Sequence, residues 1–208
     1  MKIIYGTSNK GKIESMKRIV KENNIDIEIV TSKDIGFDKD IVEDGTTFEE
    51  NSEIKAIAIA EYCNQNNIKG IVITDDAGLC IDKLNGEPGV YSARYAGDHA
   101  PQIDCINKIL DKMKQYKNME DRTAKFVCVL TAIILETGEK IVARGESKGS
   151  IAKEHGRLGG LTYVPIFIPE GFNEPMSQMT EKTYASVHNH RDLAMKKIIE
   201  NLKERKIL

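Results

Sequence analysis

The sequence predicts an α/β fold in which a long, central mixed sheet is flanked by helices. Strand-like apolar runs alternate with helical patterns in the first half of the chain, and hairpin-like runs dominate the middle. Alternating strands and helices favour parallel pairing, whereas hairpins pair antiparallel, so the two patterns together indicate one mixed sheet. The 208 residues suffice for one sizeable core or two small lobes, and no low-complexity linker divides them. We therefore expect a single domain over residues 1–208.

The first half of the chain supplies strands and helices in turn. Residues 3–5 and 71–73 are short apolar runs that predict strands, the second of them buried, and residues 25–30 alternate as a strand with one exposed face. Apolar residues at helical spacing predict a helix over residues 13–20.

The next helix carries a capping signal. Thr46 or Thr47 is suited to accept a backbone N–H at the helix start, and Glu49 or Glu50, three residues later, completes a capping box. We expect this helix to run towards Cys63.

The second half is expected to begin with a helix over residues 103–113. Residues 126–135 form a long apolar run, and a Thr-Gly turn connects it to residues 141–143, which predicts a hairpin. A short strand is expected at 166–168 between two prolines, and the tail is helical from about residue 186.

Composition and charge favour a globular protein of the cytoplasm. Charged side chains make up 30% and apolar ones 40% of the chain, as is typical of globular domains. The net charge of −2 argues against nucleic acid as a partner, and no apolar stretch approaches the roughly 20 residues that span a membrane. No signal peptide is expected, because Met1 leads directly into the first strand. The four cysteines form no CxxC pair, so we expect reduced thiols in or near the core and no zinc site.

Asp75 and Asp76 are the most informative pair of residues in the chain. They follow the run 71–73, and ligands of open α/β sheets bind beyond the carboxyl ends of strands. Mg²⁺ takes one or two carboxylates together with water and phosphate oxygens, so the pair suggests a metal site beside a phosphate. Neighbouring strand residues point to opposite faces, so one Asp is expected to face the ligand while the other supports it. A solvated turn is the alternative, since Asp and Gly are common in turns.

The polar loop between the first strand and the first helix is a candidate phosphate cradle. Backbone N–H groups at a helix start attract anions, and Ser, Asn and Lys side chains add hydrogen bonds and positive charge. The spacing of a Walker loop is absent, and a polar turn before a capped helix is also common without any ligand. The loop comprises Thr7, Ser8, Asn9, Lys10, Gly11 and Lys12.

A second polar group surrounds the start of the next helix. Glu43 lies in the loop before it, and Asn51 and Lys55 are four residues apart, so these two share a helix face. Ordinary ion pairs on a solvated surface are the alternative for Glu43, Glu50 and Lys55. The apolar neighbours of Lys55 favour a side chain aimed into a cleft.

Two further clusters have a structural and a functional interpretation. Arg94, after a Gly/Pro-rich loop, is suited to clamp a phosphate or to anchor the loop to a carboxylate, and we favour the anchoring role. His190 and Arg191 are adjacent near the start of the last helix, where they either reach one ligand or form a nonspecific surface cluster.

Taken in order, these motifs resemble those of the inosine/xanthosine triphosphate pyrophosphatases, house-cleaning enzymes that remove noncanonical purine nucleotides. The resemblance covers nearly the whole chain, and the shared order of several modest motifs argues against chance. The matching segments are residues 7–12 (TSNKGK), 43–51 (EDGTTFEEN) with Lys55-Ala56, 75–79 (DDAGL), 88–95 (PGVYSARY) and 122–130 (RTAKFVCVL).

The resemblance implies two lobes around the sheet, with the nucleotide in an active-site cleft between them, and a homodimer that requires Mg²⁺. It implies hydrolysis of a nucleoside triphosphate to the monophosphate and pyrophosphate. Carried over residue by residue, it makes Asp76 the proton acceptor and a metal ligand, Glu43 a further metal ligand and Asp75 a supporting residue.

The remaining roles that the resemblance implies concern the substrate. Lys55 and the loop 7–12 would hold the triphosphate, and the backbone of Ala77 would contact the substrate. His190 and Arg191 would reach the base or its surroundings.

The segment for the base departs from the family pattern. That pattern usually reads GGFGYDPxF, whereas residues 159–167 here read GGLTYVPIF. Leu161 replaces the stacking aromatic and Val164 replaces an Asp, while Thr162 and Tyr163 lie between them in the substrate-binding segment. Leu offers no π-face and Val makes no hydrogen bond, so the base half of the site is altered while the phosphate half matches.

A second departure lies before the last helix. The family usually has a Lys, three residues and then SHR, whereas this chain has Ala185 at the Lys position and Asn189 at the Ser position. Lys182, three residues earlier, is the candidate substitute.

Three functions follow from these observations. The first is a Mg²⁺-dependent pyrophosphatase for noncanonical purine nucleotides. The altered base segment leaves two alternatives open: a nucleotide-binding protein without turnover, and a pyrophosphatase for another modified nucleotide.

Overall fold

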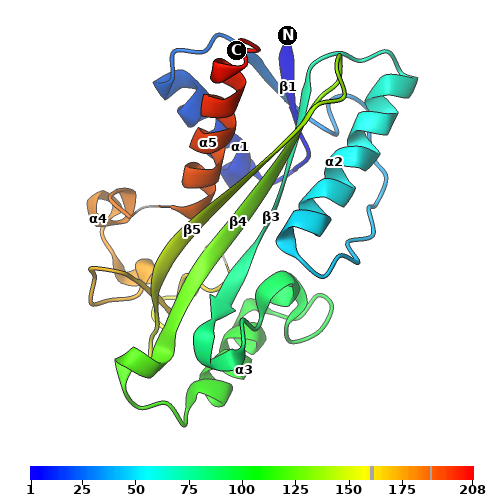
Figure 1. The fold of residues 1–208 in the computed structure, drawn as a ribbon. Coiled ribbons are helices and arrows are strands. Elements are labelled where there is room, and N and C mark those ends of the chain that lie inside the picture. The colour runs from blue at the N-terminus through cyan, green and yellow to red at the C-terminus, as the bar shows by residue number, and fades with distance from the viewer. Residues whose placement is uncertain (160–161, 188) are drawn as a thin grey trace. The chain divides into compact units, whose positions relative to one another are not determined.

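The structure is a computed structural model that describes residues 1–159, 162–187 and 189–208. Six strands of the described residues form one sheet in the order β2-β1-β3-β4-β5-β6 (Figure 1). The strands are β1 (Lys2–Tyr5), β2 (Glu28–Thr31), β3 (Ile71–Ile81), β4 (Thr123–Ile134), β5 (Lys140–Ile151) and β6 (Phe167–Pro169). The α-helices are α1 (Lys10–Glu22), α2 (Phe48–Gln65), α3 (Gln102–Met113), α4 (Glu181–Ala185) and α5 (His190–Glu204). Short 3-10 helices cover Asp82–Leu84, Gly89–Arg94, Met119–Arg122 and Met176–Gln178.

The sheet has mixed direction, as the sequence predicts. Strand β1 pairs in parallel with both of its neighbours, with Tyr5 opposite Thr31 on β2 and opposite Ile73 on β3. Strands β5 and β6 pair antiparallel. The α/β fold class is thereby confirmed.

The chain divides into two compact units. Unit 1 comprises Met1–Asp76, Cys128–Gly145 and His190–Leu208, and unit 2 comprises Ala77–Val127 and Glu146–Asn189. Strands β3, β4 and β5 each contribute residues to both units, because each strand contains one of these boundaries.

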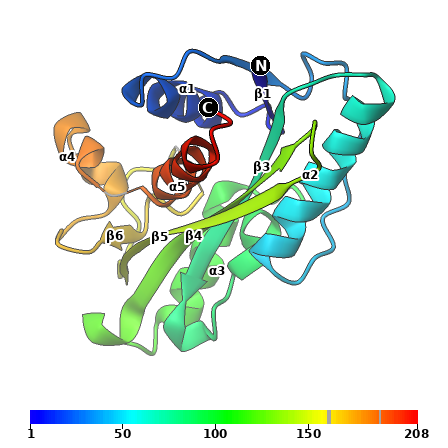
Figure 2. The same cartoon turned by 45° about the horizontal axis from the view of Figure 1, so that its top comes forward.

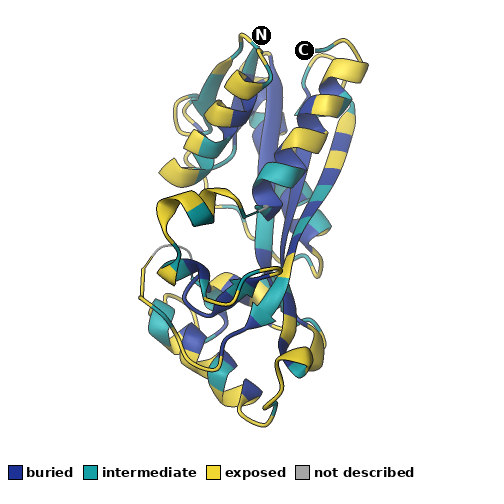
Figure 3. Ribbon diagram, turned by 90° about the vertical axis from the view of Figure 1, so that its left-hand side faces the viewer, coloured by how far each residue is buried: buried dark blue, intermediate teal, exposed yellow. Residues whose placement is uncertain are grey.

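In unit 1, helices cover both faces of the strands. Helices α1 and α5 lie side by side over one face, and α2 lies over the other (Figures 1 and 2). The strands are mostly buried, and exposed residues line the outer sides of the helices (Figure 3). The apolar cluster beneath α2 contains the buried residues Ile4, Phe37, Ile59, Ala60, Cys63 and Val72.

Helix α5 approaches β5 closely at Gly145. A Cβ atom at this position would lie 2.0 Å from the carbonyl oxygen of His190 and 2.6 Å from the backbone nitrogen of Ala194. A glycine is therefore required for the first turn of α5 to reach the strand, and this contact fixes the turn that carries Arg191.

The capping box expected before α2 is present at Thr47 and Glu50. The Thr47 side chain accepts from the backbone N–H of Glu50 at 3.1 Å, and Glu50 Oε2 accepts from the N–H of Thr47 at 3.1 Å. Glu50 also accepts from the N–H and hydroxyl of Thr46 at 2.6 and 2.8 Å. The box fixes where α2 begins and ties the preceding loop to its first turn.

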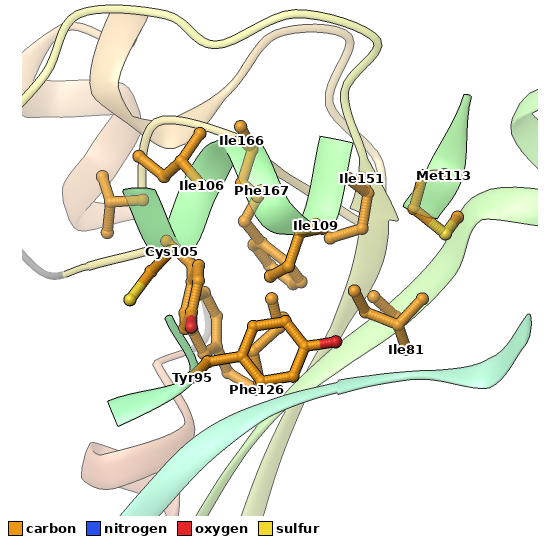
Figure 4. Packing of buried hydrophobic residues seen from close by; sticks show 14 of the residues in the cluster. Ile81, Tyr95, Cys105, Ile106, Ile109, Met113, Phe126, Ile151, Ile166 and Phe167 are labelled. Carbon is orange, nitrogen blue, oxygen red and sulfur yellow. The ribbon is translucent and has the colours of Figure 1, made fainter. Parts of the chain in front are cut away.

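Unit 2 has its own core between α3 and the strands. Figure 4 shows Ile106 and Ile109 of α3 packed with Phe126 and Phe167, whose ring centroids lie 4.5 Å apart. The buried guanidinium of Arg122 connects separate backbone segments around this core through hydrogen bonds. It donates to the carbonyls of Met113, Tyr116, Ile151 and Ala152 at 2.7–2.9 Å.

The structure differs from the sequence prediction at two strands. The apolar run 71–73 is only the first part of β3, which continues through both carboxylates to Ile81. The strand predicted over 25–30 is β2 at Glu28–Thr31, three residues later at its start. In both cases polar residues lie inside a strand because backbone pairing and tertiary contacts outweigh local preference.

None of the four cysteines, all within the described residues, forms a disulfide. Cys63, Cys105 and Cys128 are buried and Cys80 is half-buried, so the expectation of thiols in or near the core is confirmed. Among the helices that the structure describes, none is long and apolar enough to cross a membrane.

Candidate active site

The two carboxylates of β3 face different surroundings. Asp75 is buried, with 3% of its surface exposed, and contacts residues of β1, α1 and α5. Asp76 is half-buried and contacts residues of α2. This agrees with the alternation of side chains along a strand, because α2 lies over one face and α1 and α5 over the other.

Asp75 collects donors from three parts of unit 1. Its Oδ2 lies 2.8 Å from Nζ of Lys12 and 3.3 Å from Nη2 of Arg191. Its Oδ1 accepts from the hydroxyl of Tyr5 at 3.0 Å. Burial by itself would raise the pKa of Asp75, but the charges of Lys12 and Arg191 overcome this effect and hold the pKa well below its usual range. Two cations therefore share one buried, ionised carboxylate.

Tyr5 is the hydrogen-bond donor in this group. Burial, followed by the charge of Asp75, raises the pKa of Tyr5 well above its ordinary value. Its hydroxyl therefore stays protonated, and it stabilises the ionised form of Asp75.

Asp76 belongs to a second group, centred on Lys55 of α2. The ammonium of Lys55 lies 2.6 Å from Oε2 of Glu43 and 3.9 Å from Oδ1 of Asp76. The other Asp76 oxygen, Oδ2, accepts from the side-chain amide of Asn51 at 3.2 Å. Here two carboxylates contact one ammonium. The structure thus brings Glu43, Lys55 and Asp76 together.

The chemistry of this second group fits a hard divalent cation. Glu43 and Asp76 offer carboxylate oxygens around a position that already attracts the Lys55 ammonium. Mg²⁺ typically takes only one or two carboxylates and completes its shell with water and phosphate oxygens. The described residues contain no group of three or more His, Cys, Asp or Glu side chains suited to a metal.

The loop before α1 has the geometry of a capped helix start. Asn9 caps the helix and accepts from the backbone N–H of Lys12 at 3.2 Å, while Thr7 Oγ1 accepts from the N–H of Asn9 at 3.2 Å. Ser8, Lys10 and Gly11 are exposed. The helix start therefore presents polar groups to solvent next to Lys12, which in turn contacts Asp75.

His190 and Arg191 form the first turn of α5, and both are buried. Burial, and secondarily the charge of Arg191, lowers the pKa of His190 to about 3. His190 is therefore neutral near pH 7, and the positive charge at this turn belongs to Arg191.

Of the residues predicted for the base, Thr162, Tyr163 and Val164 lie in unit 2. Tyr163 and Val164 are buried in its apolar core, and the Tyr163 hydroxyl donates to the carbonyl of Ser92 at 2.8 Å. The carbonyl of Thr162 accepts from the side-chain amide of Gln102 at 3.1 Å. Leu161 lies outside the described residues.

Two other predicted residues also belong to unit 2. Ala77 is half-buried and follows Asp76 on β3. Lys182 is exposed on α4. A cavity of about 510 Å³ in the same unit is lined by residues of β4, β5 and β6, and no predicted site residue lines it.

Sequence reasoning did not include Tyr5 and Asn51 among the site residues. Tyr5 looks like an ordinary apolar strand residue, and only the fold brings its hydroxyl to a carboxylate 70 residues away. Asn51 carried a usable signal, since it shares a helix face with Lys55 and stands in the motif EDGTTFEEN.

Comparison with known proteins gives consistent matches over nearly the full length. The model of the Ham1 family matches residues 3–201. A dITP/XTP pyrophosphatase of Clostridium perfringens is 38% identical over 97% of this chain and 97% of its own length. One of Bdellovibrio bacteriovorus is 39% identical over 97% and 98%. The structure of the Staphylococcus aureus Ham1 protein has a TM-score of 0.82 at 33% identity and covers 99% of this chain and 100% of that one.

Proposed function

Because the chain belongs to the Ham1 family, we propose that it is a Mg²⁺-dependent nucleoside triphosphate pyrophosphatase. In this proposal it hydrolyses noncanonical purine nucleotides such as dITP, ITP and XTP to the monophosphate and pyrophosphate. The name that its relatives carry, dITP/XTP pyrophosphatase, supports this substrate class. The reaction would remove damaged nucleotides from the pool that polymerases use.

The arrangement around β3 is the observation that carries the proposal. Adjacent residues of one strand belong to two different groups: Asp75 contacts the cations Lys12 and Arg191, and Asp76 lies with the carboxylate of Glu43 around Lys55. A triphosphate with a bound cation needs both, since its oxygens are negative and its metal is positive. An ordinary solvated turn would not bury Asp75 between Lys12 and Arg191.

Several site residues of unit 1 have a defined part in the proposed step. The oxygen of a water molecule attacks the α-phosphorus, the bond from this phosphorus to the α,β-bridging oxygen breaks, and pyrophosphate leaves. Asp76 accepts the proton of the attacking water. Lys12, Lys55 and the start of α1 hold the phosphate oxygens, and Asp75 keeps Lys12 in place.

Glu43 and Asp76 are the proposed ligands of the metal. When bound, Mg²⁺ withdraws negative charge from the phosphate oxygens as pyrophosphate departs. We further propose that the protein is cytoplasmic, forms a homodimer and acts as a single domain.

The base-recognition role of residues 161–164, Lys182, His190 and Arg191 stays a prediction. The burial of Val164 in an apolar core favours a pocket that selects its base by groups other than this side chain. The departure from the family pattern at Leu161 and Val164 supports the second candidate, a pyrophosphatase for another modified nucleotide.

Release of pyrophosphate from a panel of triphosphates with Mg²⁺ tests the proposal. The panel contains inosine, xanthosine, the four standard bases and several modified pyrimidines. We expect release from inosine and xanthosine nucleotides, and a loss of kcat of about 10²- to 10⁴-fold in Asp76→Asn with nucleotide binding retained. Asp82→Asn, at a carboxylate of unit 2 that accepts from the Thr123 hydroxyl, is the matched control and should keep the wild-type rate.

Each outcome of the panel has a clear meaning. Release from a different nucleotide alone would favour the second candidate. Binding of nucleotides without pyrophosphate release from any member of the panel would refute the enzyme and favour a nucleotide-binding protein without turnover.

A further inference from the structure

Asn51 connects Asp76, one of the two carboxylates proposed to hold the metal, to the loop that carries the other, Glu43. It lies in α2 with only 1% of its surface exposed. Its side-chain Nδ2 donates to Asp76 Oδ2 at 3.2 Å, and its Oδ1 accepts from the backbone N–H of Gly45 at 2.9 Å. Gly45 is two residues from Glu43, and both lie in the loop that precedes α2, which we call the acidic loop. One buried amide therefore spans from β3 to the acidic loop.

The partners of Asn51 define the orientation of its amide. A backbone N–H is only a donor and an ionised carboxylate is only an acceptor, so the oxygen must face Gly45 and the nitrogen must face Asp76. An amide in this position satisfies both groups, whereas a carboxylate or an apolar side chain of similar size satisfies at most one.

The acidic loop packs directly onto Asn51. A Cβ atom at Gly45 would lie 2.7 Å from Oδ1 of Asn51 and 2.7 Å from Cβ of Glu50. Only glycine allows the backbone to come this close, which agrees with a loop whose position is set by the amide.

The contacts form a closed path through the proposed metal site. Asp76 meets Asn51, Asn51 meets Gly45, and the loop continues to Glu43, which meets Lys55 beside Asp76 again. Since Asn51 occupies Oδ2 of Asp76, the other oxygen is directed towards Lys55. The side chain thus sets both the rotation of one carboxylate and the placement of the loop that carries the other.

We propose that Asn51 is a positioning residue, which acts through Asp76 and the Glu43 loop and brings their carboxylates to one Mg²⁺ ion. This proposal rests on the proposed function, because it assumes that these carboxylates bind the metal. Residues behind metal ligands commonly contribute 10- to 100-fold to affinity or activity.

Two substitutions separate the two contacts. Asn51→Leu keeps the number and branching of the side-chain heavy atoms and removes both hydrogen bonds. Asn51→Asp keeps an acceptor for the Gly45 N–H and places an oxygen against Asp76. Asn66→Leu and Asn66→Asp are the matched controls, because Asn66 caps the other end of the same helix, roughly 22 Å away at 1.5 Å per residue.

The first readout is hydrogen exchange of the Gly45 amide by NMR, which needs neither metal nor substrate. We expect fast exchange in Asn51→Leu, and protection in Asn51→Asp, in both Asn66 variants and in the wild type. Unchanged protection in Asn51→Leu would overturn the proposed link to the loop. If thermal denaturation shows that Asn51→Leu is unfolded, the positioning role is tested with Asn51→Asp alone, by the second readout.

The second readout is the Mg²⁺ dependence of pyrophosphate release together with calorimetric titration of Mg²⁺ alone. We expect both Asn51 variants to need about 10- to 100-fold more Mg²⁺ and to lose kcat, with the KM for nucleotide changed less than threefold. A folded Asn51 variant with the wild-type Mg²⁺ requirement and kcat would overturn the positioning role. Absence of release by the wild type would instead refute the proposed function, and the Gly45 exchange result would still stand.

Discussion

The guanidinium of Arg191 meets the carboxylate of Asp75 across 116 residues of chain, with Nε and Nη2 at 3.4 and 3.3 Å from Oδ2. The side chains are 8% and 1% exposed, so both charges are largely removed from water. Such a pair is costly to break, because the remaining charge stays buried without its partner. Helix α5 is therefore held to β3 by charge as well as by apolar packing.

Removal of this guanidinium should destabilise the fold. We expect Arg191→Met to lower the free energy of unfolding by about 3 kcal/mol, at the low end for a broken buried pair because Lys12 still contacts Asp75. Urea denaturation followed by circular dichroism measures the change.

The control for this prediction is Arg18→Met. Arg18 contacts Asp192 and Glu22 with 47% of its side chain exposed, and surface pairs contribute about 0–1 kcal/mol. Equal losses in the two variants would contradict a special role for the buried pair.

Lys12 should affect substrate affinity more than stability. Its side chain is 24% exposed beside the start of α1, and Arg191 remains to compensate Asp75 when it is removed. We expect Lys12→Met to raise the KM for a triphosphate about 10-fold, which corresponds to about 1.4 kcal/mol. Steady-state kinetics of pyrophosphate release give the value. Lys17→Met, on the same helix and paired with Glu14 at the surface, should leave KM unchanged. A normal KM in Lys12→Met would remove Lys12 from the phosphate site.

His190 should make stability depend on pH in the acid range. Burial holds its pKa at about 3 in the folded state, against about 6.5 in the unfolded chain. Between these values the unfolded state binds a proton that the folded state does not, so stability rises with pH through this window. Below pH 3 the contribution no longer changes.

The test compares the wild type with His190→Gln. Urea midpoints from pH 3.5 to 7.5 should rise more steeply with pH in the wild type than in the variant, because carboxylates contribute equally to both. Parallel curves would show that His190 titrates normally and is not buried as a neutral ring.

Arg122 should be among the most important residues for the stability of unit 2. Four carbonyl oxygens lose their donor when it is removed, and each buried group left unpaired costs about 1–3 kcal/mol. We expect Arg122→Met to lower the free energy of unfolding by at least about 3 kcal/mol, as measured by urea denaturation. Arg157→Met, at an exposed position, should stay within about 0.5 kcal/mol of the wild type. A small effect at Arg122 would mean that water replaces the guanidinium.

Much of the fold was accessible from sequence patterns. The capping signal at Thr47 and Glu50, the helical spacing of Ile106 and Met113, and the Thr-Gly turn between β4 and β5 are local features, so the sequence contains them directly. The extent of β3 was not accessible, because its polar second half is held in the sheet by neighbouring strands.

The candidate site was predictable to a similar extent. Glu43, Lys55 and Asp76 were assigned by pattern and resemblance, and the structure brings them together. The environment of Asp75 depends on Tyr5 and Arg191, which are far away in the chain, and no local pattern reports such contacts. The burial of His190 likewise depends on how α5 docks at Gly145.

The order in which unit 1 is synthesised has a consequence for its folding in the cell. Helix α5 is its last element, and a ribosome adding roughly 5–20 residues per second reaches Arg191 about 6–23 s after Asp75. Throughout this interval the apolar strand surface that α5 covers stays exposed, and the Asp75 carboxylate is not yet paired with the Arg191 guanidinium. Chaperone protection of the nascent chain therefore matters until α5 has been synthesised, and a message truncated ahead of α5 would yield an aggregation-prone product instead of a smaller folded protein.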